Sequence, residues 1–195
     1  MEFDDLIRQF VEDGSVKFGI FSGKSGIEYN CETDIRLSLT SFEKSKIVCE
    51  IIYQMVEKYD FEYDYFIGVP ETGTLISSFL NAEKYKKSSS DFYYNYLRAV
   101  PKHRQENTDS AYTILPRKEG PIAILIEDDV VTGNTMISYL KDAKIAGIEI
   151  TAVISIFGRR MYTEILKNKI KSEFGITYIS LIDTEYIKRM IDNEK

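Results

Sequence analysis

Three consecutive carboxylates, on Glu127, Asp128 and Asp129, are the side chains in this sequence best suited to binding a ligand. They follow the apolar run Ile122 to Ile126 and precede the turn Thr132-Gly133-Asn134-Thr135. Backbone N–H groups of such a turn, with its two threonine hydroxyls, can bind a phosphate group, and the glycine lets the main chain approach closely. Carboxylates repel phosphate, but they accept hydrogen bonds from sugar hydroxyls and can help to hold hydrated Mg²⁺. A ribose 5-phosphate would satisfy both groups of residues.

The elements around these residues predict how they are positioned. The run Ile122 to Ile126 is too short for a helix and does not alternate, which is typical of a central strand buried on both faces. After the turn, Ile137, Leu140 and Ala143 follow at helical spacing. Ligands of open α/β sheets bind beyond the carboxyl ends of strands, so this strand, turn and helix predict a binding site. Two simpler interpretations stay open: an acidic loop that closes a strand, and acids that interact with the helix dipole.

Strands and helices alternate along most of the chain. Apolar residues at helical spacing predict a helix over 3–12, and a capping box at Thr40 and Glu43 predicts a second helix that reaches about Lys58. The other elements that we predict are strands over 27–32, 36–39, 63–69, 92–100, 149–157 and 176–182, helices over 75–84 and 161–171, and a final helix capped by Asp183. The order of elements beyond residue 41 predicts the α/β class, with a central parallel sheet flanked by helices and right-handed crossovers.

Composition excludes several classes of function. The 195 residues are 44% hydrophobic and 29% charged, which is ordinary for one soluble globular domain. A net charge of −6 argues against a general nucleic-acid binder. No apolar run approaches the roughly 20 residues that span a bilayer, and the N-terminus does not resemble a signal peptide. Cys31 and Cys49 lack the spacing of metal ligands and are expected to be free thiols. We therefore expect a cytoplasmic protein without nucleic-acid or membrane partners.

The segment Ile126 to Thr135 resembles the phosphoribosyl-pyrophosphate (PRPP) motif of type I phosphoribosyltransferases. In that motif two acids precede a Thr-Gly-rich phosphate loop. Here Asp129 stands where the family usually has an apolar residue, and Val131 where it usually has Thr or Asp. A register shifted by one residue pairs Asp128 and Asp129 with the two acids, but it places Asn134 at the glycine position. All three acids and the loop Thr132 to Thr135 therefore remain candidate PRPP ligands.

A second resemblance lies near the N-terminus, from Phe18 to Gly26. Gly23-Lys24-Ser25 suggests a nucleotide P-loop, but Phe18 stands where that motif needs its first glycine. The segment instead resembles the Phe-Gly-x-Phe-x-x-Lys-Ser-Gly signature of orotate phosphoribosyltransferases, where it belongs to a hood over the base. This resemblance implies that Lys24 lies near both pyrophosphate and orotate. A β-turn with an exposed lysine is the simpler alternative.

Two further turns resemble parts of the same family. The turn Pro70-Glu71-Thr72-Gly73 is similar to the pyrophosphate loop, whose main-chain donors face the leaving group. Gly158-Arg159 is similar to a common Asp-Arg pair whose arginine contacts the orotate carboxylate, although Gly158 replaces the acid. A forked cation is what a carboxylated base requires. The simpler interpretation of Arg159 is an exposed arginine at the start of a helix.

The polar segment 101–110 contains the only histidine of the chain and is long for a loop within a compact domain, which suggests a binding loop. It resembles the family's catalytic loop, Arg-Lys-x-x-Lys-x-His-Gly. Arg98 and Lys102 match the arginine and the second lysine, Ala99 replaces the first lysine, and His103 follows one place early. The resemblance implies that Lys102 and His103 neutralise the leaving pyrophosphate and that Arg98 contacts PRPP.

These motifs occur in the family's order and cover nearly the whole chain, so we expect the type I phosphoribosyltransferase fold in one domain, 1–195. Residues 1–40 would form an N-terminal helix and a small hood, and 41–195 the α/β core. The resemblance implies transfer of phosphoribosyl from Mg²⁺-PRPP to orotate in pyrimidine nucleotide biosynthesis, by a homodimer with shared active sites. The catalytic residues would be Glu127, Asp128, Lys102 and His103, with Mg²⁺ carried by PRPP near the two acids rather than held by the protein alone.

Two alternatives to this hypothesis remain open. The first is a phosphoribosyltransferase that acts on another nucleobase. The second is a non-catalytic regulator that binds PRPP, which the departures at Ala99, Asp129 and Val131 motivate.

Overall fold

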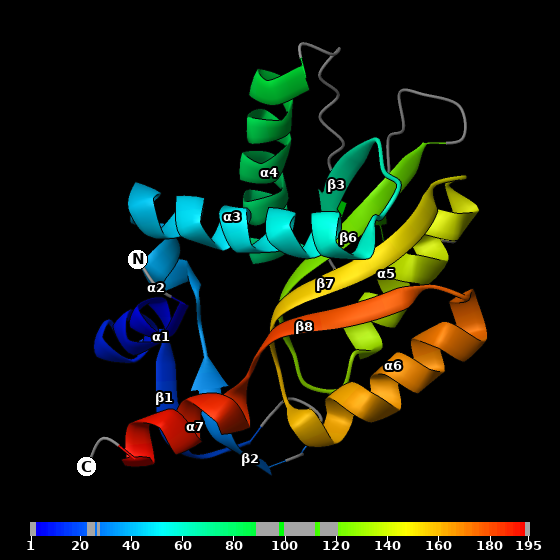
Figure 1. Ribbon diagram of the computed structural model, residues 1–195. Coiled ribbons are helices and arrows are strands. Elements are labelled where there is room, and N and C mark those ends of the chain that lie inside the picture. The colour runs from blue at the N-terminus through cyan, green and yellow to red at the C-terminus, as the bar shows by residue number, and fades with distance from the viewer. Residues whose placement is uncertain are drawn as a thin grey trace.

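A four-stranded parallel sheet forms the centre of the computed structural model, which describes residues 3–22, 26, 28–88, 98–99, 112–113 and 121–193. The strand order is β3-β6-β7-β8, and each neighbouring pair is parallel (Figure 1). Its strands are β3 (Tyr65–Gly68), β6 (Ile122–Val130), β7 (Glu149–Gly158) and β8 (Thr177–Asp183). The prediction of a central parallel sheet is confirmed.

Helices cover both faces of this sheet. Side chains of α3 and α4 pack on one face, in a core that also includes residues of α1, α7 and the first two strands. Side chains of α5 and α6 pack on the other face. Because β6 is apolar on both sides, it is buried between these layers, as its continuous apolar run predicts. The helices are α1 (Phe3–Glu12), α2 (Arg36–Leu39), α3 (Phe42–Tyr59), α4 (Thr72–Ser88), α5 (Asn134–Ile145), α6 (Arg160–Phe174) and α7 (Thr184–Asn193).

The N-terminal segment adds a separate hairpin of two antiparallel strands, β1 (Val16–Ser22) and β2 (Glu28–Thr33). We call this hairpin the hood. It lies beside α7 and the start of α6, away from the β3 edge of the sheet (Figure 1). A second antiparallel pair joins β4 (Arg98–Ala99) to β5 (Tyr112–Thr113). The rest of the strand predicted over 92–100 lies outside the described residues.

The prediction of a strand over 36–39 is wrong, because these residues form the short helix α2. Two exposed residues, Arg36 and Leu37, precede two buried ones, Ser38 and Leu39, and this pattern does not alternate. The hydroxyl of Ser38 donates a hydrogen bond of 2.6 Å to Asp13, which also accepts 2.6 Å from Lys44. This buried polar contact ties α2 to the chain that enters the hood.

The capping box expected at Thr40 and Glu43 is displaced by one residue. Ser41 is the N-cap of α3, and its hydroxyl accepts from the backbone N–H of Lys44. The hydroxyl of Thr40 instead donates to the carbonyl oxygen of Leu37 at 2.7 Å, which closes the end of α2. The expected helix itself is confirmed and ends at Tyr59.

The edge strand β3 obtains two of its hydrogen bonds from a side chain. Asn81 of α4 accepts from the backbone N–H of Phe66 and donates to its carbonyl oxygen, both at 2.8 Å. These bonds satisfy buried backbone groups that would otherwise lack partners at a sheet edge. They also fix α4, which begins at the predicted pyrophosphate loop, to the strand before that loop.

None of the described helices is long and apolar enough to cross a lipid bilayer.

Candidate active site

The three acids lie within β6 rather than beyond it, which corrects the prediction that the strand ends at Ile126. Parallel pairing with β7 continues as far as Asp129 opposite Phe157 and Val130 opposite Gly158. Because successive side chains of a strand point to opposite faces, this extension separates the acids. Glu127 and Asp129 line a cavity at the phosphate loop, whereas Asp128 lines a different cavity toward the hood.

Glu127 is the most enclosed of the three carboxylates, with 7% of its surface exposed. Burial raises its pKa well above the usual value, and the hydrogen bond and negative charge of Asp128 raise it further. The Oε1 atom of Glu127 accepts a hydrogen bond of 3.2 Å from the backbone N–H of Asp128. A carboxyl in this setting is suited to bonding a neutral polar group, such as a sugar hydroxyl, rather than to facing a phosphate.

The predicted phosphate loop, Thr132-Gly133-Asn134-Thr135, forms the start of α5. Gly133 is the N-cap and has φ 73°, a left-handed conformation that glycine adopts without strain. A Cβ at this position would lie 2.6 Å from two side-chain carbons of Leu166. The loop lines a cavity of about 280 Å³ together with Glu127 and Asp129. A helix N-terminus that opens onto a cavity can bind a phosphate through its free backbone N–H groups.

The predicted pyrophosphate loop packs against the acidic end of β6. The backbone N–H of Val69 donates to the carbonyl oxygen of Ile126 at 2.9 Å. The two ends of the turn also meet closely, which glycine at 68 and 73 permits: a Cβ on Gly68 would lie 2.0 Å from the backbone of Gly73. The peptide bond between Pro70 and Glu71 is cis. The contacts of Val69 and Gly73 with Ile126 place Glu71 and Thr72 in the same cavity as Asp128.

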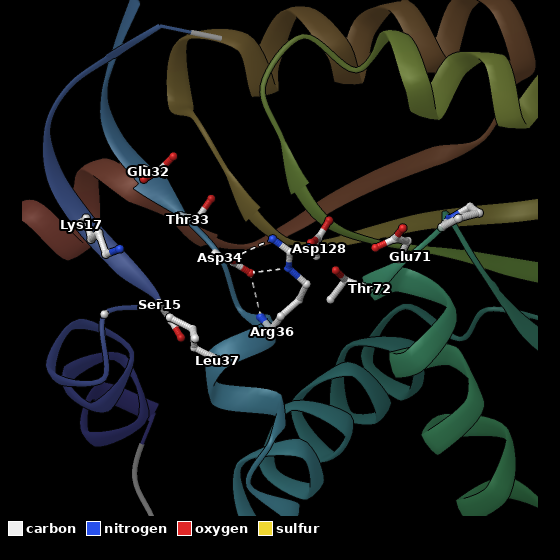
Figure 2. A pocket seen from close by; sticks show the side chains of 12 residues that line it. Ser15, Lys17, Glu32, Thr33, Asp34, Arg36, Leu37, Glu71, Thr72 and Asp128 are labelled. Carbon is white, nitrogen blue, oxygen red and sulfur yellow. Dashed lines mark hydrogen bonds and ion pairs between the residues drawn. The ribbon is translucent and has the colours of Figure 1, made fainter. Parts of the chain in front are cut away.

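A cavity of about 540 Å³ lies between this turn, Asp128 and the base of the hood. Figure 2 shows Glu71, Thr72 and Asp128 at one side of it, Lys17 at the opposite side, and the side chain of Arg36 between them. Arg36 donates two hydrogen bonds to Asp34, at 2.7 and 2.8 Å, and extends toward Asp128 and Glu71. The pKa of Arg36 is raised by the hydrogen bond and charge of Asp34, and to a smaller extent by Asp128 and Glu71.

Sequence reasoning missed both cations of this cavity. Arg36 was assigned to a strand, so nothing placed it beside the acids of β6. The pattern Asp34-x-Arg36 before a capping residue was the available signal, since an acid two residues before an arginine can orient it. Lys17 lies on β1, a strand for which the sequence analysis predicted no bounds.

Arg159 lies at the end of β7 and is buried, with 7% of its surface exposed. Its Nη1 donates to Oδ1 of Asp129 and to the carbonyl oxygen of Val130, and its Nη2 donates to the carbonyl oxygen of Cys31 at 3.1 Å. The guanidinium also stacks over the ring of Tyr29, 4.8 Å from its centroid. The interpretation of Arg159 as an exposed arginine is therefore wrong.

Arg159 also reaches a third cavity, of about 700 Å³, between the hood and the start of α6. The walls of this cavity combine an isoleucine and two tyrosine rings with two arginines, two glutamates and an asparagine; its lining is Ile20, Glu28, Tyr29, Asn30, Arg159, Arg160, Tyr162 and Glu185. Flat aromatic surfaces beside a forked cation are suited to a planar ring that carries a carboxylate.

Four of the predicted site residues cannot be placed in this geometry. Lys24, Lys102 and His103 lie outside the described residues. Arg98 belongs to β4 by its backbone, but its side chain is outside the description. The residues that the structure brings to one end of the sheet are Glu71, Thr72, Gly73, Glu127, Asp128, Asp129, Thr132, Gly133, Asn134, Thr135 and Arg159.

Comparison with known proteins gives a consistent result at the level of whole sequences. No protein-family model matches the chain. The orotate phosphoribosyltransferase of Pyrococcus furiosus is 28% identical over 157 residues, which are 80% of this chain and 81% of that protein. The orotate phosphoribosyltransferase of Pyrococcus horikoshii is 27% identical over 180 residues, which are 92% of this chain and 89% of that protein.

Solved structures with less sequence similarity share the fold. Orotate phosphoribosyltransferase from Aeropyrum pernix superposes with a TM-score of 0.75 at 16% identity, over 96% of this chain and 98% of that one. UMP synthase from Leishmania donovani gives a TM-score of 0.74 at 19% identity, over 97% of this chain but only 38% of that longer chain. The fold is therefore that of the type I phosphoribosyltransferases, and the sequence is similar to orotate phosphoribosyltransferases over most of its length.

Proposed function

We propose that this protein is an orotate phosphoribosyltransferase. It transfers the phosphoribosyl group of PRPP to orotate and forms orotidine 5′-monophosphate and pyrophosphate, a step of pyrimidine nucleotide biosynthesis. In this reaction the bond between the ribose and pyrophosphate breaks, and a bond forms between the ribose and a ring nitrogen of orotate. Positive charge develops on the ribose and negative charge on the departing pyrophosphate, so catalysis is electrostatic and positional.

The 5-phosphate and the ribose occupy neighbouring positions at the end of β6. The loop Thr132 to Thr135 binds the 5-phosphate in the cavity of about 280 Å³ at the start of α5. Glu127 and Asp128 accept hydrogen bonds from the ribose hydroxyls, on the side of the sugar where positive charge grows. Glu127 lines the same cavity as the phosphate loop, which supports its assignment to the sugar that carries this phosphate.

The pyrophosphate occupies the cavity of about 540 Å³ beside Glu71, Thr72 and Asp128. The backbone of Glu71 to Gly73 donates to it, and by family resemblance Lys24, Arg98, Lys102 and His103 supply positive charge.

The donor atoms of this cavity also suit Mg²⁺. The carboxylates of Glu71 and Asp128 are hard oxygen ligands on the same wall, and Mg²⁺ commonly binds one or two carboxylates while substrate phosphates and water complete its shell. PRPP would carry the ion into the cavity, where it would neutralise part of the pyrophosphate charge.

Orotate occupies the cavity beneath the hood, where Arg159 bonds its carboxylate. One observation carries the proposal: a buried arginine lies one strand away from an acidic strand end that opens onto the N-terminus of a helix. The buried arginine favours a base that carries a carboxylate. The acidic strand end and the helix N-terminus favour a ribose phosphate. By family resemblance we further propose a homodimer with shared active sites in the cytoplasm.

The experiment follows the absorbance of orotate with the purified protein, with and without PRPP and with and without Mg²⁺. Consumption that depends on both additions is the expected result. Turnover of uracil or a purine in place of orotate would assign the protein to another base. PRPP binding without turnover of any of these bases would contradict catalysis and favour a regulator.

A further inference from the structure

The guanidinium of Arg159 is held by acceptors on two elements that are distant in sequence. Asp129 and the carbonyl oxygen of Val130 lie on β6, and the carbonyl oxygen of Cys31 lies on β2 of the hood. Among the described residues, Asp129 is the acid that forms an ion pair with Arg159. Because β6 and β7 are paired, Asp129 lies opposite Phe157, which is two residues before Arg159.

The position before Arg159 cannot provide this carboxylate. Gly158 packs so closely that an added Cβ would lie 2.4 Å from Oγ of Ser180 and 2.9 Å from Oγ1 of Thr163. Any side chain at 158 would therefore require Ser180 on β8 and Thr163 on α6 to move. The acid that bonds the arginine comes from the neighbouring strand, at the position where the PRPP motif usually has an apolar residue.

The ion pair and the two carbonyl bonds do not use every donor of the guanidinium. Among the described residues Nε of Arg159 is buried without a hydrogen-bond partner, while the side chain lines the cavity beneath the hood. An arginine has five N–H donors in a rigid fork, so two or three acceptors can fix its plane while other donors bond a ligand. Without a fixed plane, a buried arginine would have to be ordered again on each binding event, which weakens binding.

We propose that Asp129 is a positioning residue for base recognition, which orients Arg159 toward the carboxylate of the base, and that it is not a PRPP ligand. This inference rests on the proposed function and deepens it. The three consecutive acids then have two separate tasks. Glu127 and Asp128 serve the sugar, and Asp129 serves the base through Arg159.

The experiment compares Asp129→Val and Asp129→Asn in steady-state kinetics with each substrate varied in turn. Asp129→Val removes the acceptor, and we expect the KM for orotate to rise about tenfold to a hundredfold, the range for losing a hydrogen bond to a charged group. The KM for PRPP should stay within about twofold, because the sugar ligands are intact. Asp129→Asn keeps an acceptor oxygen and should restore most of the affinity for orotate.

A rise in the KM for PRPP with an unchanged KM for orotate, in either variant, would overturn the proposal and make Asp129 a PRPP ligand. The asparagine variant preserves shape, so it decides this point even where the valine variant does not fold. Asp142→Asn is the matched control, because Asp142 is a half-buried carboxylate on α5 with an oxygen that lacks a partner among the described residues. We expect it to change neither KM.

A double-mutant cycle tests whether Asp129 acts through Arg159. In an Arg159→Met background, Asp129→Val should leave the KM for orotate unchanged, since the group that it orients is absent. Additive increases would contradict the positioning role. Failure of the proposed function is distinguishable, because it would appear as absence of orotate turnover in the unmodified protein, before any variant is compared.

Discussion

Gly73 packs against the carbonyl oxygen of Ile126 so closely that an added Cβ would lie 2.4 Å from that oxygen. The same oxygen accepts the hydrogen bond from Val69, so the proposed pyrophosphate loop and the acidic strand end are joined at this point. The position of this loop relative to Glu127 and Asp128 therefore depends on Gly73 having no side chain.

Gly73→Ala should move the pyrophosphate loop away from β6. We expect a loss of stability of about 1–3 kcal/mol from overpacking and a higher KM for PRPP, measured by urea unfolding and steady-state kinetics. Gly19→Ala on the hood is the control, because its added Cβ would meet only the ring of Phe21, at 3.3 Å. Equal effects of the two substitutions would contradict the steric argument.

Gly133→Ala should weaken PRPP binding and stability together. The substitution places a side chain at φ 73°, which costs about 1–3 kcal/mol, and it adds a clash with Leu166. Gly147→Ala is a matched control, because Gly147 has the same φ of 73° but no atom within 4 Å of the added Cβ. Urea unfolding should show the larger loss for Gly133→Ala, and only this variant should raise the KM for PRPP.

The burial of Glu127 predicts a specific dependence of stability on pH. Its pKa in the folded protein lies well above the ordinary 4.5, so the folded state binds this proton more tightly than the unfolded state does. The contribution of protonated Glu127 to the free energy of unfolding is complete below about pH 4.5. It is lost as the pH rises through the pKa that Glu127 has in the folded protein. Glu127→Gln cannot ionise, so its free energy of unfolding should decline less with rising pH. Parallel curves for the two proteins would contradict the assignment.

Lys102→Ala tests the leaving-group role that the family resemblance gives to Lys102. Charge on the departing pyrophosphate grows in the transition state, so kcat should fall by about 10²- to 10³-fold, whereas the Kd for PRPP should change by less than about tenfold. Single-turnover kinetics and calorimetry separate the two quantities. Lys46→Ala is the control, because Lys46 is an exposed lysine on α3 that forms an ion pair of 3.7 Å with Glu50, which is also exposed. A variant that loses equally in kcat and affinity would exclude a specific role in the transition state.

The core of the fold was predictable from the sequence because each part of it has a local signal. The apolar run Ile122 to Ile126 marks a strand buried on both faces, and a glycine turn followed by helical spacing marks α5. The helix at 36–39 was not predictable, because four residues with two apolar positions suit a strand or a helix equally. Burial of Ser38 against Asp13, a contact over 25 residues, decides for the helix.

The candidate site was predictable as a set of residues but not as a geometry. The extension of β6 through Asp129 depends on pairing with Phe157, which no local pattern reveals. That extension divides the three acids between two cavities and brings Asp129 to Arg159. Motif spacing found Glu127, Asp128 and Arg159, whereas the partnership of Asp129 with Arg159 exists only in the folded sheet.

Phosphorus NMR of a complete reaction shows whether this protein joins the phosphoribosyl group to orotate. Incubation with orotate and Mg²⁺-PRPP should replace the PRPP signals by those of orotidine 5′-monophosphate and pyrophosphate in equal amounts. Arg159→Met should slow the appearance of both products together at subsaturating orotate. PRPP signals that persist with orotate, or products that form equally well when uracil replaces it, would contradict the account.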